Sequence, residues 1–69
     1  MKEFDLAGHE FIALNQLLKM MGLIDTGGEA NLRIDDGEVL VNNTVELQRR
    51  KKLRSGDKVI FHDQEVIIK

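Results

Sequence analysis

The sequence predicts an α+β fold in which two short helices pack on a small antiparallel sheet. One observation is a stripe of Leu14, Leu17, Leu18 and Met21, whose spacings of three, one and three residues are those of a helix face. A second is a run of short, valine- and isoleucine-containing segments separated by turn residues in the second half of the chain. Helices grouped before a run of strands are typical of the α+β class.

Two short strands are predicted before the first helix. Phe4 and Leu6 alternate with polar residues, residues 7–9 have the composition of a turn, and residues 10–12 predict a second strand. Gly22 is placed to end the helix that carries the leucine stripe.

The second helix is predicted over residues 28–36. Asp25 or Thr26 can cap its first turn, and Glu29 lies three residues after Thr26, which is the spacing of a capping box. Gly37 is expected to end the helix.

An antiparallel meander is predicted to follow the second helix. Its expected strands are residues 39–41, 44–46, 58–61 and 65–68. Asn42-Asn43 tolerates positive φ and therefore predicts a tight turn between the first two strands. No proline, repeat or low-complexity segment marks a linker, so residues 1–69 are expected to form a single domain.

The composition limits both stability and location. A chain of 69 residues buries one modest core, and without cysteine it has neither a disulfide nor a thiolate metal site to support that core. The three aromatic residues, Phe4, Phe11 and Phe61, are expected to be needed in this core. The apolar runs are too short for a transmembrane helix and the first residues lack a secretory signal, so we expect a cytoplasmic location. We also expect a monomer.

Charge is distributed unevenly along the chain. Residues 1–48 hold three Lys or Arg against nine Asp or Glu, whereas residues 49–69 hold seven against three. This asymmetry predicts a basic face on an acidic body. Its strongest part is the run Arg49, Arg50, Lys51, Lys52 and Arg54, whose mutual repulsion a polyanion would relieve. A solvated loop without function is the alternative, but Leu53 inside the run and turns around it favour a folded edge.

A weaker signal lies at the start of the second helix. Thr26-Gly27-Gly28 would present backbone N–H groups that bind an anion, although a plain helix cap is the commoner meaning of such residues. Lys19, Asn31 and Arg33 are expected to extend the polar surface. Arg33 occupies a position where an apolar residue would continue the helix stripe.

Catalytic and metal-binding patterns are missing from the sequence. His9 and His62 have no ligand partner at metal spacing and are interpreted as surface residues. Asp35-Asp36 is an adjacent pair on a helix, where neighbours do not face one another. No nucleotide-binding loop or Ser-His-Asp order occurs, so we expect no enzyme, cofactor, metal or small-molecule substrate.

The ordered motifs resemble a known family. They are Leu14-x-x-Leu17-Leu18, Gly22, Gly28-Glu29-Ala30, Ile34-x-x-Gly37, Val39-x-Val41-Asn42-Asn43, Lys52-Leu53 and Gly56-Asp57-x-Val59. This set, over residues 11–61, is similar to the alpha-L RNA-binding domain of the ribosomal small-subunit protein S-four family, and most of all to its small stand-alone bacterial members. The resemblance implies two helices on a sheet and contacts with structured RNA, such as rRNA or tRNA, from Thr26 to Asn31 and from Arg49 to Lys52.

Three positions depart from that family's pattern. Many members have a basic residue where this chain has Gly27-Gly28-Glu29, which leaves a phosphate contact there to backbone amides. Asn42-Asn43 replaces the usual Asn-Gly turn, and Arg33 replaces a commonly apolar residue. Structured RNA is recognised mostly through shape, phosphates and 2′-hydroxyls, so base stacking on phenylalanine is not expected. Residues 49–52 are expected to be needed for binding and not for folding.

Two other kinds of function share some features with this sequence. A ubiquitin-like sulfur carrier shares the valine-rich strand and the later Gly-Asp-x-Val, but it needs a C-terminal Gly-Gly, and this sequence ends Val66-Ile67-Ile68-Lys69. A protein-interaction module would use the acidic surface of residues 1–48 and would show a large exposed apolar patch. Leu23-Ile24 and Leu47 are the candidates for such a patch.

Overall fold

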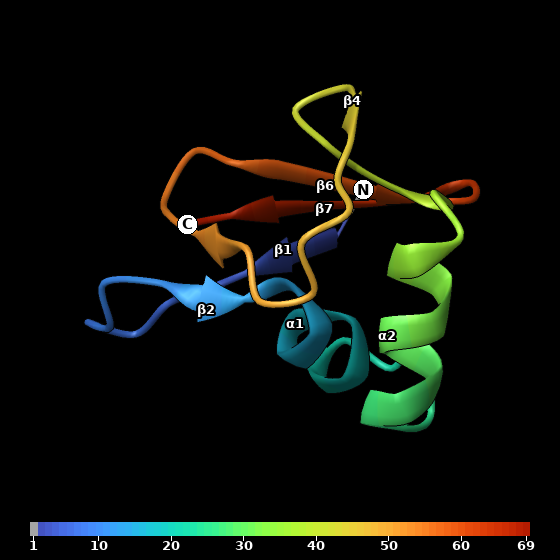
Figure 1. The fold of residues 1–69 in the computed structure, drawn as a ribbon. Helices are drawn as coiled ribbons and strands as arrows, with labels where there is room; N and C mark the ends of the chain where they lie inside the picture. The colour runs from blue at the N-terminus through green and yellow to red at the C-terminus, as the bar shows by residue number, and fades with distance from the viewer. Residues whose placement is uncertain (1) are drawn as a thin grey trace.

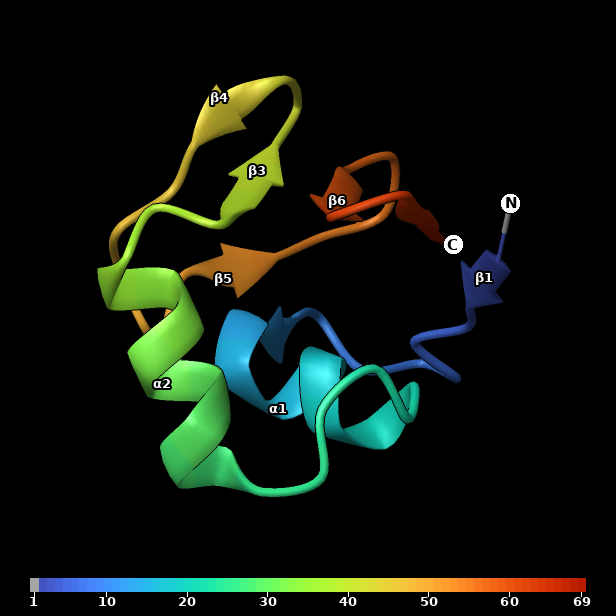
Figure 2. The same ribbon diagram turned by 90° about the vertical axis from the view of Figure 1, so that its right-hand side faces the viewer.

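The computed structural model describes residues 2–69 and contains both predicted helices. The elements in chain order are β1 (Lys2–Phe4), β2 (Ile12–Ala13), α1 (Leu14–Met20), α2 (Gly27–Asp35), β3 (Val39–Val41), β4 (Thr44–Val45), β5 (Lys52–Leu53), β6 (Lys58–Phe61) and β7 (Gln64–Ile68). The helices lie side by side on one side of the strands (Figures 1 and 2). The α+β class predicted from the sequence is confirmed.

The main sheet is mixed, not wholly antiparallel as predicted. Its order is β1-β7-β6-β3-β4, and within residues 2–69 the strands β2 and β5 form a separate antiparallel pair. β1 runs parallel to β7, with Lys2 opposite Val66 and Phe4 opposite Ile68. These strands come from the two ends of the sequence, so no hairpin turn marks their pairing. The other neighbours in the main sheet are antiparallel, as expected.

The core lies between the helices and the sheet. Leu14, Leu17 and Leu18 of α1 are fully buried, which confirms the predicted leucine stripe. Both Ala30 and Ile34 of α2 face the same core. In β3 and β6 alternate residues are buried, so these strands turn one face to the helices and the other away from them.

The chain enters α1 directly from a strand. β2 covers Ile12 and Ala13 instead of the predicted residues 10–12, and α1 begins at the next residue, Leu14. Ala13 precedes the helix and makes no side-chain capping bond. The N–H groups in the first turn of α1 therefore need acceptors from elsewhere in the fold.

Local rules explain the ends of α2. The Thr26 hydroxyl accepts a hydrogen bond from the backbone N–H of Glu29 at 3.1 Å, which confirms the predicted cap. The Glu29 carboxylate turns instead to Arg33, at 3.4 Å. Gly37 follows the helix with φ +77°, a left-handed conformation that glycine adopts without strain. The turn between β3 and β4 has Asn42 and Asn43 at φ 52° and 69°, as their residue type predicted.

Candidate nucleic-acid interface

The basic segment, defined as residues 49–54, is attached to the core by one of its own residues. Leu53 is 0% exposed, and β5 pairs with β2 so that Leu53 lies opposite Ile12 and Lys52 opposite Ala13. Successive residues of a strand point to opposite faces. Burying Leu53 therefore directs Lys52 and Arg54, which are both exposed, toward solvent. The predicted folded edge is present in the structure.

The basic segment also supplies the acceptors that the start of α1 lacks. The backbone N–H of Leu14 donates to the Lys51 carbonyl at 2.9 Å, and that of Asn15 donates to the Arg49 carbonyl at 3.0 Å. These bonds satisfy donors that a helix start leaves without partners. The backbone of the segment is thus fixed against α1, while the side chains of Arg49, Arg50, Lys52 and Arg54 are exposed.

Arg49 connects the segment to the end of α2. Its Nε donates to Asp35 Oδ1 at 3.0 Å, and a second guanidinium nitrogen contacts the other carboxylate oxygen. The hydrogen bond from Arg49 holds the pKa of Asp35 below its usual range, and Asp35 in turn raises the pKa of Arg49. Because Arg49 is already paired, it contributes less unpaired charge than its neighbours.

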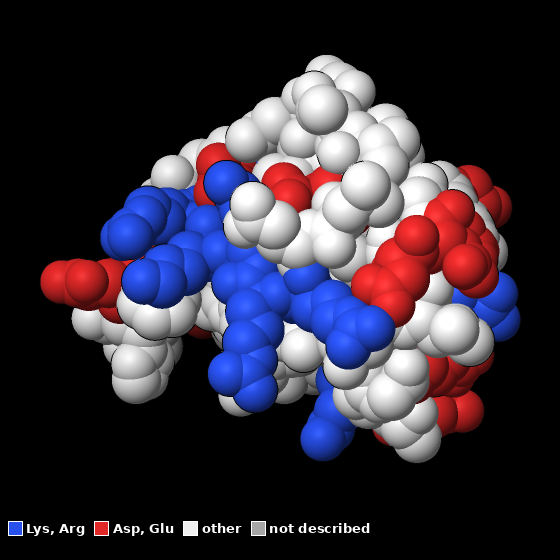
Figure 3. All heavy atoms as spheres, viewed as in Figure 1, with Lys and Arg blue, Asp and Glu red and all other residues white. Residues whose placement is uncertain are grey.

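The remaining cations of the segment are available to a ligand. Among residues 2–69, no ion pair involves Arg50, Lys51, Lys52, Arg54 or Lys19, which lies in the last turn of α1. Figure 3 shows Lys and Arg gathered over the chain between β4 and β5, and Asp and Glu gathered over α2. The charged side chains are thus arranged as the sequence predicts, with a basic face on an acidic body.

The start of α2 is open but lies away from the basic segment. A Cβ built on Gly27 or Gly28 would meet no atom within 4 Å, so these backbone groups can be approached closely. Arg49, however, contacts Asp35 at the opposite end of α2. At 1.5 Å per residue the helix is about 12 Å long. Thr26, Gly27 and Gly28 are therefore a second region and not part of the basic edge.

Asn31 and Arg33 make contacts within the protein. Asn31 Oδ1 accepts a hydrogen bond from Asn15 Nδ2 at 3.0 Å, which links the two helices. Arg33 lies between Glu38, at 3.2 Å, and Glu29, and the hydrogen bond to Glu38 is the main cause that raises the pKa of Arg33. The cationic surface expected from Arg33 is thus largely neutralised by its two carboxylate partners.

Phe11 is a surface residue that sequence reasoning placed wrongly in the core. It is 39% exposed, with Lys52 Nζ 5.0 Å and the Arg54 guanidinium carbon 5.7 Å from its ring centroid. Phe61, in contrast, is buried as expected, and Phe4 packs against the core. The signal that could have located Phe11 is its neighbour Ile12, whose burial turns the preceding side chain outward.

Of the residues named as candidates for the apolar patch of a protein-interaction module, only Leu47 is exposed. Ile24 is buried and Leu23 packs against the core, so this pair is not an exposed patch. Leu47 is 60% exposed. Three other large apolar side chains are also exposed: Met20 of α1, Leu32 of α2 and Val45 of β4.

The histidines and acidic residues form no metal site within residues 2–69. His9 and His62 are exposed, as predicted, and His62 Nε2 lies 2.7 Å from Glu38 Oε1. Asp35 and Asp36 are exposed neighbours, and Asp35 is directed to Arg49. Over the same described residues, no helix is long and apolar enough to cross a membrane.

Comparison with known proteins decides the family. A family model described as S4 domain matches residues 4–69. The chain belongs to the S4 domain family. The solution structure of YbcJ from Escherichia coli, reported to reveal an alfaL motif involved in RNA-binding, has a TM-score of 0.76 and 34% identity, covering 99% of this chain and 86% of that one. The resemblance predicted from the ordered motifs is confirmed.

Two relatives of this S4 domain chain carry functional names. "Putative RNA-binding protein YbcJ" of Escherichia coli (strain K12) is 35% identical over 69 residues, which cover 97% of this chain and 99% of the relative. "Probable ribosome maturation protein RlbA" of Bacillus subtilis (strain 168) is 42% identical over 50 residues, which cover 72% of this chain and 70% of the relative.

Proposed function

We propose that this S4 domain chain binds structured RNA through its basic segment. The observation that carries the proposal is a set of cations with no ion-pair partner among residues 2–69: the exposed Arg50, Lys52 and Arg54 and the half-buried Lys51. Their backbone is fixed by α1 and by buried Leu53. A rigid row of unpaired cations favours a polyanion because binding releases counterions. The relatives named for RNA binding and ribosome maturation support RNA as that polyanion.

The proposal gives the site residues different roles. The basic segment would contact phosphates, and Lys19 in the last turn of α1 would extend the cationic surface. The backbone amides at Thr26, Gly27 and Gly28 would hold a second phosphate about one helix length away. Asn31, Arg33 and Arg49 would act mainly by fixing the two helices and the segment to each other, since each has a partner within the protein.

The chemistry favours ribosomal RNA or tRNA as the target class. A folded RNA presents phosphates and 2′-hydroxyls in a fixed shape, which suits a preformed protein surface. The proposal includes binding without catalysis, by a monomer in the cytoplasm.

The test compares binding to a hairpin fragment of ribosomal RNA and to a DNA duplex of equal length, at several salt concentrations. Four phosphate contacts predict a slope of log affinity against log salt of about −3 to −4. The variant Arg50→Gln, Lys51→Gln, Lys52→Gln is expected to lose most binding and to reduce the slope by about 2 to 3. Arg49 is left in place because its side chain holds α2.

A matched control removes the same charge elsewhere. Lys2→Gln, Lys58→Gln, Lys69→Gln changes three lysines on or beside the main sheet, so a general effect of net charge would weaken both variants equally. Equal RNA affinity in the wild type and the basic-segment variant would reject the site. An absence of binding to either nucleic acid at low salt would reject the function and favour a protein partner.

A further inference from the structure

The structure places an aromatic ring at the edge of the basic segment. Phe11 directly precedes β2. The first residue of that strand, Ile12, is buried in the core. Because β2 pairs with β5, Phe11 shares the outer face with Lys52 and Arg54. The core does not bury the Phe11 ring, and two cations contact it. This arrangement provides a π surface among groups that attract phosphate.

A shallow hollow of about 440 Å³ adjoins this ring. Its lining consists of Phe11, Ala13, Asn15, Gln16, Arg50 and Lys52. The lining therefore combines one aromatic ring, two amide side chains and two cations. Asn15 is held in place by its hydrogen bond to Asn31, so at least one amide is positioned before a ligand arrives.

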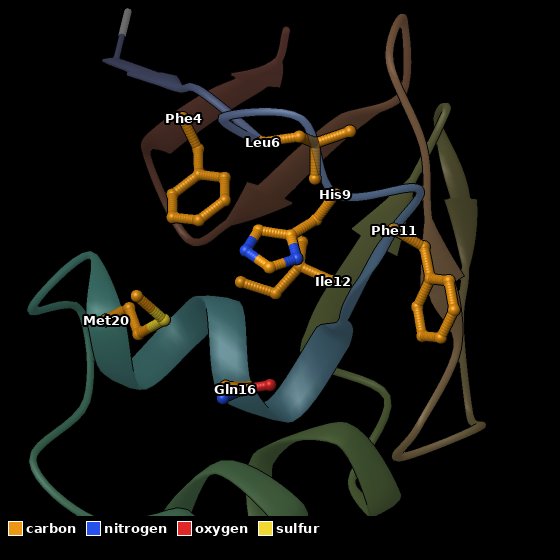
Figure 4. A pocket seen from close by; sticks show the side chains of 7 residues that line it. All are labelled: Phe4, Leu6, His9, Phe11, Ile12, Gln16 and Met20. Atoms are coloured by element: carbon orange, nitrogen blue, oxygen red, sulfur yellow. The ribbon is translucent and has the colours of Figure 1, made fainter.

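A second hollow that Phe11 also lines has different chemistry. It has a volume of about 240 Å³, and its lining includes Phe4, Leu6, Ile12 and Met20 but no Lys or Arg. In Figure 4 the Phe11 ring stands apart from the cluster that Phe4, Leu6, His9 and Ile12 form. The cationic hollow is thus the one suited to a phosphate-bearing ligand.

We propose that the cationic hollow binds one unpaired nucleobase of the RNA, stacked on Phe11. This inference rests on the proposed RNA-binding function and names the part of the RNA that this site takes. The amides of Asn15 and Gln16 contact the polar edge of the base, and Arg50 and Lys52 contact the flanking phosphates. A base within a duplex is stacked and paired already, so only an unpaired base can lie on the ring.

The cations that now contact Phe11 do not prevent stacking. Lys52 and Arg54 are exposed, long side chains, and a cation–π contact at an exposed site is weaker than stacking of a base on an aromatic ring. A base can therefore replace a cation at the ring. The displaced cation remains within reach of the phosphate next to that base.

The test uses three RNA probes with the same stem: a hairpin with a uridine loop, the same hairpin with abasic sites in the loop, and the fully paired duplex. Phe11→Leu is expected to weaken binding to the uridine hairpin roughly 5- to 150-fold, the range that loss of one base–aromatic stack gives. Binding to the abasic hairpin and the duplex is expected to change less than about twofold, because stacking contributes nothing there.

Two variants separate stacking from a loss of structure. Phe11→Tyr keeps the ring and is expected to retain near-wild-type affinity for the uridine hairpin, whereas Val45→Ala alters an exposed apolar residue of β4 and serves as the control. Equal weakening of all three probes by Phe11→Leu, or no weakening of any, would overturn the base site. If the wild type binds the RNA and the basic-segment variant does not, the proposed function stands independently of that result.

Discussion

Leu53→Ala tests whether one buried residue holds the basic segment in place. Leu53 is 0% exposed and lies between the exposed residues Lys52 and Arg54. Truncating a fully buried leucine removes its transfer free energy and leaves a cavity, at a cost of about 2–5 kcal/mol. A chain of this length has a free energy of unfolding of roughly 3–10 kcal/mol. The variant is therefore expected to lose a large fraction of its stability.

Urea denaturation followed by circular dichroism measures this loss, and thermal unfolding should show Tm lowered by at least about 10 °C. Leu53→Met, which nearly conserves volume, is expected to cost less than about 1.5 kcal/mol. Leu47→Ala, at a residue 60% exposed, is expected to stay within about 0.5 kcal/mol of the wild type.

Hydrogen exchange then shows whether the segment itself is released. The amides of Leu14 and Asn15 donate to carbonyls of Lys51 and Arg49. In Leu53→Ala these two amides are expected to lose protection, because the paired strands β2 and β5 are only two residues long. A cost below about 1 kcal/mol, or wild-type protection at both amides, would refute the reasoning that Leu53 anchors the segment.

Two further predictions concern stability. The hydrogen bond from His62, and after it the one from Arg33, lowers the pKa of Glu38. The contribution of ionised Glu38 to the free energy of unfolding is therefore complete above the ordinary glutamate pKa of about 4.3 and is lost as the pH falls through the lower pKa of the folded state. Glu38→Gln should flatten the acid side of a curve of unfolding free energy against pH, and an unchanged curve would contradict this. Gly37→Ala should cost about 1–2 kcal/mol because Gly37 has φ +77°, whereas Gly27→Ala, in open space without positive φ, should be neutral or slightly stabilising in urea denaturation.

Features set by near neighbours in the sequence were predicted well. The Thr26 cap, the end of α2 just before Gly37 and the Asn42-Asn43 turn all depend on a few consecutive residues and their preferred backbone angles. The leucine stripe of α1 and the alternation in β6 follow from the periods of helix and strand. The basic run was visible for the same reason, because its residues are adjacent.

The tertiary structure decided which of the candidate residues act together. Two features that it decided join segments that are distant in the sequence: the parallel pairing of β1 with β7 and the contact of Arg49 with Asp35. The outward direction of Phe11 depends on another such pairing, that of β2 with β5. Composition and periodicity report which face of an element is buried, but not which element covers it. The sequence by itself therefore determined the helices, the turns and the basic character of residues 49–54. Only the packing of β5 and the helices decided that these cations form a fixed edge beside an exposed aromatic ring.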